Sequence, residues 1–166
     1  MKAYLEQKKN FPFIPFIINI AIPLIFGASS RYFVRASTDN WSLNVNKPEY
    51  SPSSEAAVTI LISLYFLIGI SSFIIWKLRK TIKNYPGVIC IYFTQLVLHF
   101  AWRITYFGQD DFFFSLYFIG AGLVVAILNM IVFYRINKLA GLLLVPYILW
   151  IIYSLNLTYS IYLLNL

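Results

Sequence analysis

Charged residues are absent from long stretches of this chain. Five stretches contain no Asp, Glu, Lys or Arg; they cover residues 10–30, 56–76, 84–102, 112–134 and 139–166 and are 21, 21, 19, 23 and 28 residues long. About 20 apolar residues in an α-helix cross the ~30 Å hydrocarbon core of a bilayer. The pattern therefore predicts five transmembrane helices, at about 10–33, 55–77, 86–107, 112–134 and 139–163.

The apolar stretches are continuous, which favours helices over a membrane β-barrel. A barrel strand would alternate apolar and polar residues over about 10 positions, whereas a helix satisfies its own backbone hydrogen bonds within lipid. Of all residues, 60% are hydrophobic and 11% are charged, against about 25% charged in soluble domains. We expect an all-α integral membrane bundle forming one domain over residues 1–166, and a soluble domain is excluded.

Basic residues gather on one side of the predicted bundle. Five spans place nine of the thirteen basic residues together with a single acid, Glu6; the nine are Lys2, Lys8, Lys9, Lys77, Arg79, Lys80, Lys83, Arg135 and Lys138. The positive-inside rule then predicts a cytoplasmic N-terminus and an extracytoplasmic C-terminus. This topology accounts for the net charge of +7, so no nucleic-acid partner is expected.

One connection between the predicted spans is long. Residues 35–54 contain two prolines, which stiffen the chain, together with aromatic and basic side chains: Trp41, Lys47, Pro48, Tyr50 and Pro52. Loops on a rigid scaffold often carry function, so this loop is a candidate lid over a cavity between helices. The alternative is an anchor whose aromatic rings lie at the lipid headgroups, and composition alone favours the anchor.

The third predicted span carries a polar and aromatic stripe. Gln95, His99, Trp102 and Tyr106 follow the spacing of one helix face, and Arg103 borders it. Polar side chains in hydrocarbon are costly unless they face other helices or a cavity. The stripe therefore predicts either hydrogen bonds between helices or a pocket wall. For the lone His99, hydrogen bonding is favoured over metal ligation because no metal-ligand spacing accompanies it.

Two further spans show patterned faces. On the fifth span, Trp150, Tyr153 and Ser154 cluster around one side. On the fourth, the small residues Gly122 and Ala126 would allow close approach of another helix. We expect these two small residues to form a helix–helix seam, within one chain or between two copies.

No catalytic constellation is present in the sequence. None of the six acidic residues lies in one of the five charge-free stretches, the single Cys90 and the single His99 are nine residues apart, and there is no phosphate-binding loop. Proton relays and ion pumps usually carry acids within the membrane, so an ion-coupled transporter is disfavoured. An aromatic, weakly polar cavity instead suits a flat, mostly apolar ligand.

Three motifs stand out along the chain: WSLNVNKPEYSP at 41–52, QLVLHFAWRITYFG at 95–108 and LAGLLLVPYILWIIYS at 139–154. They resemble the translocator protein family, also called tryptophan-rich sensory proteins or peripheral-type benzodiazepine receptors. The first is similar to the family's W-Y-x2-L-x-K-P-x-W-x-P-P, the second to its Q-L-x-L-N-x2-W-x3-F-F-G, and the third to its closing helix. The resemblance covers nearly the whole chain, and all four Trp residues stand at family Trp positions.

The resemblance implies a five-helix bundle in the lipid membrane, usually a homodimer, that binds porphyrins and haem-like tetrapyrroles. Animal relatives also bind cholesterol and benzodiazepine-type drugs, and bacterial relatives act as sensors or regulators. We accordingly expect a membrane sensor or carrier with porphyrin or haem as ligand and no obligatory cofactor. The alternatives are a porphyrin-degrading, photo-oxidative enzyme and a passive facilitator of apolar solutes.

The resemblance also implies a set of pocket residues. Combined with the stripe on the third span, the predicted ligand-binding residues are Trp41, Pro48, Pro52, Leu61, Tyr65, Gln95, His99, Trp102, Tyr106, Phe114, Trp150 and Ser154. The lid motif comprises Lys47, Pro48 and Tyr50. No catalytic residue and no metal ligand is predicted, and His99 as a haem ligand is the less favoured hypothesis.

Several positions depart from the family pattern. Leu61 replaces a family Trp that helps to line the pocket, which weakens the case for aromatic-dependent photochemistry. His99 stands where the family has Asn, and Tyr50 where it has Trp. No Lys or Arg follows Lys138, so the family's C-terminal sterol motif is missing and sterol specificity is not predicted.

Overall fold

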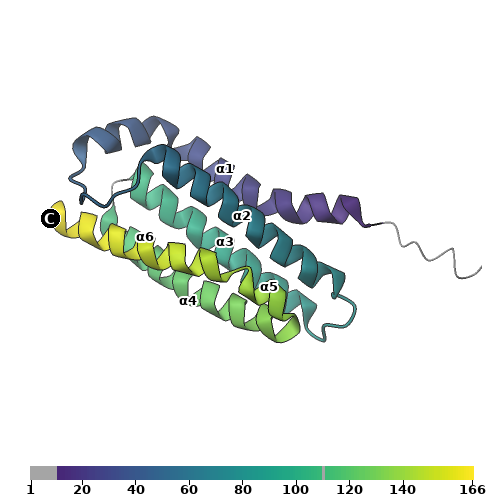
Figure 1. The fold of residues 1–166 in the computed structure, drawn as a ribbon. Coiled ribbons are helices and arrows are strands. Elements are labelled where there is room, and N and C mark those ends of the chain that lie inside the picture. Colours follow the sequence, from purple (N-terminus) through teal and green to yellow (C-terminus); the bar gives the residue numbers. More distant parts are fainter. Residues whose placement is uncertain (1–10, 110) are drawn as a thin grey trace, which may run out of the picture.

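Long helices lie side by side in the computed structural model, which describes residues 11–109 and 111–166, with side chains for all of these except 34–44 (Figure 1). The helices are α1 (Phe13–Asn44), α2 (Ser54–Lys77), α3 (Tyr85–Gly108), α4 (Phe112–Ile136), α5 (Lys138–Leu142) and α6 (Val145–Leu164). Within the described residues, five helical stretches are long and apolar enough to cross a membrane, and α5 and α6 together form the fifth. The prediction of an all-α membrane bundle is confirmed. The predicted cytoplasmic residues Lys2, Lys8 and Lys9 lie outside the described residues.

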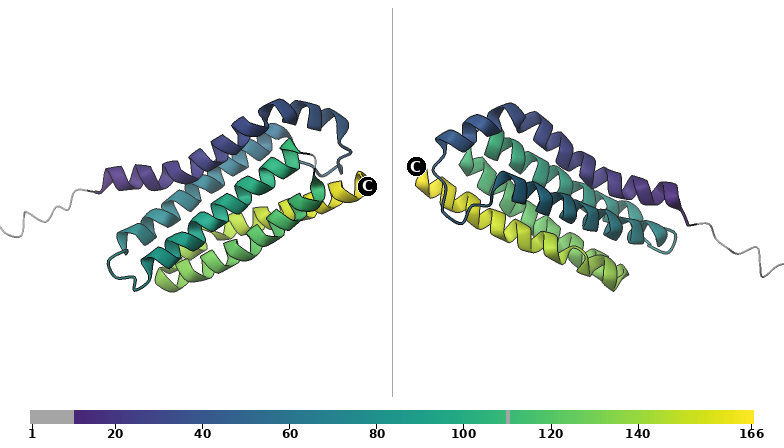
Figure 2. Two further views of the ribbon diagram at one scale, coloured as in Figure 1. Left: turned by 180° about the vertical axis from the view of Figure 1, so that it is seen from behind. Right: turned by 45° about the horizontal axis from the view of Figure 1, so that its top comes forward.

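The helices close into a ring. α1 packs against α2 and α3, α4 packs against α3 and α6, and the short α5 contacts both α4 and α2. Figure 2 shows the same arrangement from two further sides. Sequence neighbours are therefore not always spatial neighbours, and α2 and α6 come to flank the same interior space.

Polar caps set where three of the spans and α5 begin. In each case a side-chain oxygen accepts a hydrogen bond from the backbone N–H three residues later, at 3.0–3.2 Å; the caps are Ser53, Asn84, Asp111 and Asn137. A capping side chain satisfies one of the backbone donors that a helix start leaves without a partner. The predicted starts of these spans agree with the observed ones to within one residue.

α1 is longer than the sequence pattern predicted. It continues to Asn44, so the expectation of an irregular segment over 35–54 is wrong for residues 35–44, and only 45–53 lies between helices. No Pro or Gly occurs between Gly27 and Pro48, and these are the residues that most often end a helix. The last turns of α1 arch toward the C-terminal end of α6 (Figure 1).

The fifth span is interrupted near one end. α5 stops at Leu142 and α6 begins at Val145, with Leu144 N–H bonded to the Gly141 carbonyl at 3.0 Å. Pro146 follows directly, and proline has no N–H to continue the helical ladder. The predicted span over 139–163 is present, and the structure divides it into a short and a long helix.

Small residues bring pairs of helices close together. A Cβ on Gly69 would lie 2.6 Å from the Ile20 Cα of α1. Gly122 and Ala126 are buried within the chain, and the nearest atom to a Cβ on Gly122 belongs to Leu98 of α3. The predicted seam of Gly122 and Ala126 is thus a contact within one chain, and the alternative of a seam between copies is wrong for these residues.

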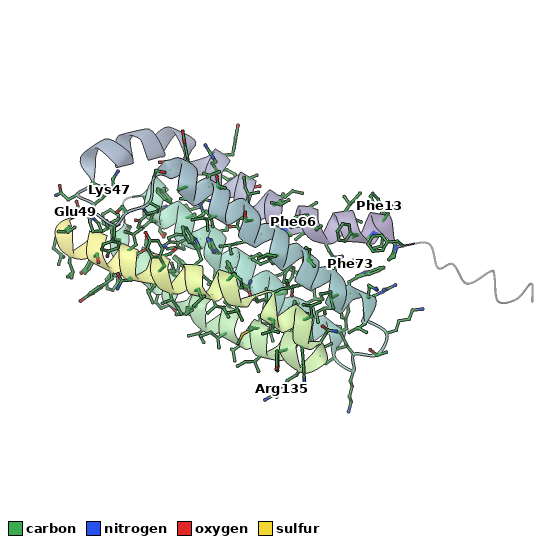
Figure 3. All side chains as sticks on the ribbon, in the orientation of Figure 1. Phe13, Lys47, Glu49, Phe66, Phe73 and Arg135 are labelled. Atoms are coloured by element: carbon green, nitrogen blue, oxygen red, sulfur yellow. The ribbon has the colours of Figure 1, made fainter. Side chains whose placement is uncertain are left out.

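Charged residues occupy the two ends of the bundle. Figure 3 shows Lys47 and Glu49 at the end where α6 finishes, while Arg135 lies toward the opposite end. At that opposite end the Arg79 guanidinium lies 3.7 Å from the centre of the Trp76 ring, a cation–π contact.

Candidate functional site

A cavity of about 400 Å³ lies inside the bundle at the end that carries Lys47. This volume is within the range of small-molecule sites in proteins. The cavity is enclosed by α2, α3 and α6, by residues of the 45–53 segment, and by Arg31 from α1. Its lining residues are Arg31, Lys47, Ser51, Pro52, Ser54, Ala57, Val58, Leu61, Trp102, Arg103, Tyr106, Phe107, Trp150, Tyr153, Ser154, Leu157 and Ile161.

Two aromatic walls face this cavity. On α3, Trp102 and Tyr106 are one turn apart, with ring centres 5.4 Å from each other. On α6, Trp150 and Tyr153 have ring centres 5.3 Å apart. Helical periodicity places each pair on one face of its helix, so flat apolar surfaces line the interior from two sides.

The α2 wall is different in character. It presents Ala57, Val58 and Leu61, which are small or aliphatic. Leu61 lines the cavity at the position where the resembling family carries a Trp. The smaller side chain leaves space there, and the aromatic surface of the site comes from α3 and α6 alone among the described helices.

The 45–53 segment, called the lid from here on, is attached to α6 by hydrogen bonds. The Tyr50 hydroxyl contacts Asn156 Oδ1 at 3.0 Å and Ser160 Oγ at 2.6 Å. Tyr153 donates its hydroxyl proton to the Tyr50 carbonyl at 2.9 Å. Asn165 and Asn46 add two bonds of 3.0 Å, one in each direction. These hydrogen bonds hold the lid against α6, and Val45 of the lid also packs against the core.

Positive charge characterises the cavity. Arg31, Lys47 and Arg103 line it, and no Asp or Glu is among the described lining residues. Arg103 is only 8% exposed, although it is charged. Such a lining favours a ligand with an apolar body and negative charge.

Half of the predicted site residues meet at this cavity. Six of the twelve predicted ligand-binding residues line it, as does Lys47 of the lid motif; the six are Pro52, Leu61, Trp102, Tyr106, Trp150 and Ser154. They come from the lid and from three helices that are distant in sequence. That these residues bind a ligand remains a prediction.

Three predicted residues are buried deeper in the bundle and do not line the cavity. Gln95 accepts a hydrogen bond from Asn129 of α4 at 2.9 Å. His99 Nδ1 lies 2.9 Å from the Tyr147 hydroxyl of α6. Tyr65 packs beside His99, with ring centres 6.0 Å apart. For Gln95 and His99, the structure supports the interpretation of hydrogen bonds between helices.

The remaining predicted residues are not in the described cavity wall either. Phe114 is 54% exposed near the start of α4, and α4 contributes no residue to the cavity. Pro48 and Tyr50 belong to the lid but are not among the residues that line the cavity. The side chain of Trp41 lies outside the described residues.

Several lining residues were not predicted. Leu157 and Ile161 continue the α6 face of Ser154 at helical spacing, and Ala57 precedes Leu61 by one turn on α2. That spacing was the available signal, but apolar residues on an apolar helix do not distinguish a cavity wall from a lipid-facing side. Arg103 was noted beside the stripe without being assigned to the site.

The described residues provide no metal centre. No three His, Cys, Asp or Glu side chains within them come together, and the single His99 has Tyr147 as its neighbour. The cavity can therefore enclose, stack against and neutralise a ligand through its own side chains.

Comparison with known proteins identifies the architecture. The sequence profile described as the TspO/MBR family matches residues 19–164. The "Tryptophan-rich protein TspO" of Archaeoglobus fulgidus is 35% identical over 149 residues, which cover 90% of this chain and 95% of that protein. The "Translocator protein" of Sus scrofa is 26% identical, covering 91% and 90% of the two chains. The "Tryptophan-rich sensory protein" of Cereibacter sphaeroides is 24% identical, covering 92% and 90%. This multi-pass integral membrane protein belongs to the TspO/MBR family.

Proposed function

We propose that the protein binds a porphyrin or haem-type tetrapyrrole in the cavity between α2, α3 and α6 and acts as a membrane sensor or carrier for it. Membership of the TspO/MBR family supports a sensor or transporter kind of role. The cavity supplies the argument for the class of ligand.

One observation carries the proposal: two aromatic pairs and three basic residues line the same cavity. A tetrapyrrole is a flat conjugated ring that carries carboxylates at its edge. Trp and Tyr rings stack on flat apolar surfaces, and Arg and Lys attract carboxylates. A purely aliphatic ligand would use the apolar surface and leave the basic residues without a role.

The lid explains how such a ligand would enter and leave. Tyr50 and Asn46 hold the lid through hydrogen bonds to exposed groups of α6, and each such bond contributes only about 0.5–1.5 kcal/mol. These bonds can break and reform without unpacking the helices. Access would then require lid opening and not rearrangement of the bundle.

Titration of the purified protein with protoporphyrin IX, read by quenching of Trp fluorescence, tests the proposal. We expect saturable quenching that Trp150→Phe and Trp102→Phe each reduce, because both rings line the cavity. Trp76→Phe is the matched control, since Trp76 lies at the other end beside Arg79. No saturable quenching, or equal effects of all three substitutions, would contradict the proposal.

A second candidate function is light-driven degradation of the bound porphyrin. Each cavity Trp has a Tyr ring within 5.5 Å, at ring-centre distances of 5.3 and 5.4 Å, and such pairs are oxidisable. Bleaching of the porphyrin spectrum in light, with a defined product that forms only when the protein is present, would favour this enzyme activity. A stable spectrum would favour binding alone.

We also expect the chain to form a homodimer, as the family resemblance implies. Light scattering of the purified protein, corrected for bound detergent, measures the mass directly. A mass of one chain across the accessible concentration range would contradict this expectation.

A further inference from the structure

We propose that Arg103 is the anion-binding residue of the cavity and that it selects ligands that carry a carboxylate on an otherwise apolar body. The inference rests on the proposed function in one respect, namely that the ligand occupies this cavity. It goes further by assigning the residue that discriminates an acidic ligand from a neutral one of the same shape.

The position of Arg103 is the first argument. It lies on α3 between Trp102 and Tyr106, and all three line the cavity. Its side chain is 92% buried, since only 8% is exposed. Its Nε is shielded and has no hydrogen-bond partner among the described residues. The residue nevertheless lines the cavity, so other atoms of its side chain border the space that a ligand would fill.

The charge of Arg103 is the second argument. A guanidinium stays protonated in proteins, and a buried charge without a counter-ion is costly. Among the described residues no carboxylate forms an ion pair with Arg103. Its neighbours are the Tyr65 hydroxyl and the Phe107 ring, whose centre is 5.9 Å from the guanidinium carbon. Neither neighbour supplies negative charge.

Arg31 is a second basic residue of the cavity. It is exposed, but it lines the same space as Arg103. An anion bound in that space would be attracted by both side chains. A carboxylate matches the planar fork of a guanidinium, which can donate two parallel hydrogen bonds to it.

The alternative role for Arg103 is purely structural, as a link between α3 and Tyr65 of α2. That role and the proposed one make different predictions. A structural arginine would be indifferent to the charge of the ligand, whereas an anion-binding arginine would favour an acid over its neutral ester.

The experiment compares protoporphyrin IX with its dimethyl ester, which keeps the macrocycle and removes both negative charges. The protein is placed in nanodiscs of phosphatidylcholine, so that no anionic lipid competes. We expect the diacid to bind at least about tenfold more tightly than the ester, the usual size of a hydrogen-bonded charge contact. Arg103→Gln should remove most of this preference by weakening diacid binding.

Arg135→Gln is the matched control, because Arg135 is a basic residue at the opposite end of the bundle and should leave the preference intact. Equal affinities for diacid and diester in the unmodified protein would overturn the inference, while any porphyrin binding would leave the proposed function standing. This comparison needs no variant, so it can overturn the inference even if Arg103→Gln does not fold.

Two further measurements distinguish the inference from the proposed function and from lipid binding. If neither porphyrin binds, the proposed function fails. The inference about Arg103 can then still be tested by comparing the affinities of a pyrene-labelled fatty acid and its methyl ester. Adding phosphatidylglycerol to the nanodiscs tests whether a lipid phosphate binds at Arg103. An affinity for the diacid that does not change supports the inference. If the lipid competes with the diacid, and Arg103→Gln abolishes that competition, the inference is overturned in favour of a lipid headgroup.

Discussion

His99 and Arg103 are one turn apart on α3, yet the structure gives them different surroundings. Arg103 lines the cavity, whereas His99 packs between Trp102 and Tyr147, with ring-centre distances of 5.1 and 5.7 Å. Its Nδ1 contacts the Tyr147 hydroxyl, and the cavity reaches Trp102 without reaching His99. At the scale of single residues, a shift of one turn along α3 thus separates a residue that packs between helices, His99, from one that lines the cavity, Arg103.

We therefore predict that His99 does not ligate haem iron. Metal-free porphyrin and haem should bind with similar affinity, because the His99 imidazole does not line the cavity. The Soret spectrum of bound haem should be the same in the unmodified protein and in His99→Asn. Absorption spectroscopy of both proteins checks this, and a histidine-type spectrum that His99→Asn abolishes would show the prediction to be wrong.

At the scale of elements, the contact between α1 and α2 depends on a missing side chain. Gly69 lets the α2 backbone approach Ile20, where a Cβ would lie 2.6 Å from the Ile20 Cα. Beside this contact, Ser72 donates a hydrogen bond of 2.7 Å to Asn19 Oδ1 across the same pair of helices. The close approach of α1 and α2 thus allows dispersion contacts between the two helices and the buried hydrogen bond between Ser72 and Asn19, and both stabilise the bundle.

We predict that Gly69→Ala destabilises the bundle by about 1–3 kcal/mol, the usual result of forcing an extra carbon into a packed interface. Gly120→Ala is the control, since a Cβ there meets no atom within 4 Å. That change should be neutral or slightly stabilising, because Ala is the better helix former by up to about 1 kcal/mol. Thermal unfolding in one detergent compares the two, and equal melting temperatures would contradict the packing argument.

The lid is the second element whose behaviour can be tested. Tyr50→Phe removes the hydroxyl that contacts Asn156 and Ser160 but keeps the ring. We expect bound porphyrin to dissociate about 3–10-fold faster, as expected for the loss of one to two hydrogen bonds of moderate strength. Stopped-flow dissociation measures this. Tyr117→Phe, on an exposed side chain of α4, should leave the rate unchanged, and a Tyr50→Phe rate equal to that of the control would contradict the role of the lid.

At the scale of the whole molecule, charge is divided between the two ends. Lys77, Lys80 and Lys83 lie at or near the α2–α3 turn, and Arg135 and Lys138 flank the α4–α5 turn. Because the spans alternate in direction, both turns lie at the same end of the bundle (Figure 1). The other end carries Glu49 and Glu55 beside its own basic residues.

We predict from this division that the C-terminus is extracytoplasmic, since basic turns are retained in the cytoplasm. Alkaline phosphatase fused after Leu166 should be active, and green fluorescent protein fused there should not fluoresce. The same reporters inserted in the 78–84 turn should give the opposite result. Fluorescence from the C-terminal fusion would show the orientation to be wrong.

The sequence by itself determined the membrane bundle. Within lipid each span must satisfy its own backbone hydrogen bonds, so the length and hydrophobicity of a segment are sufficient to predict a helix. Helical spacing also fixes which side chains share a face, and it correctly grouped Trp102 with Tyr106 and Trp150 with Ser154. The family motif further predicted that lid, α2, α3 and α6 residues would meet.

Only the tertiary structure decided what lies opposite each face. Gln95 and Trp102 share a stripe on α3, yet one meets Asn129 of α4 and the other meets the cavity. Periodicity gives the direction of a side chain but not the neighbour that fills the space, which depends on how five helices close into a ring. For the same reason Phe114 is exposed and does not line the cavity, while Arg103, beside the predicted stripe, does.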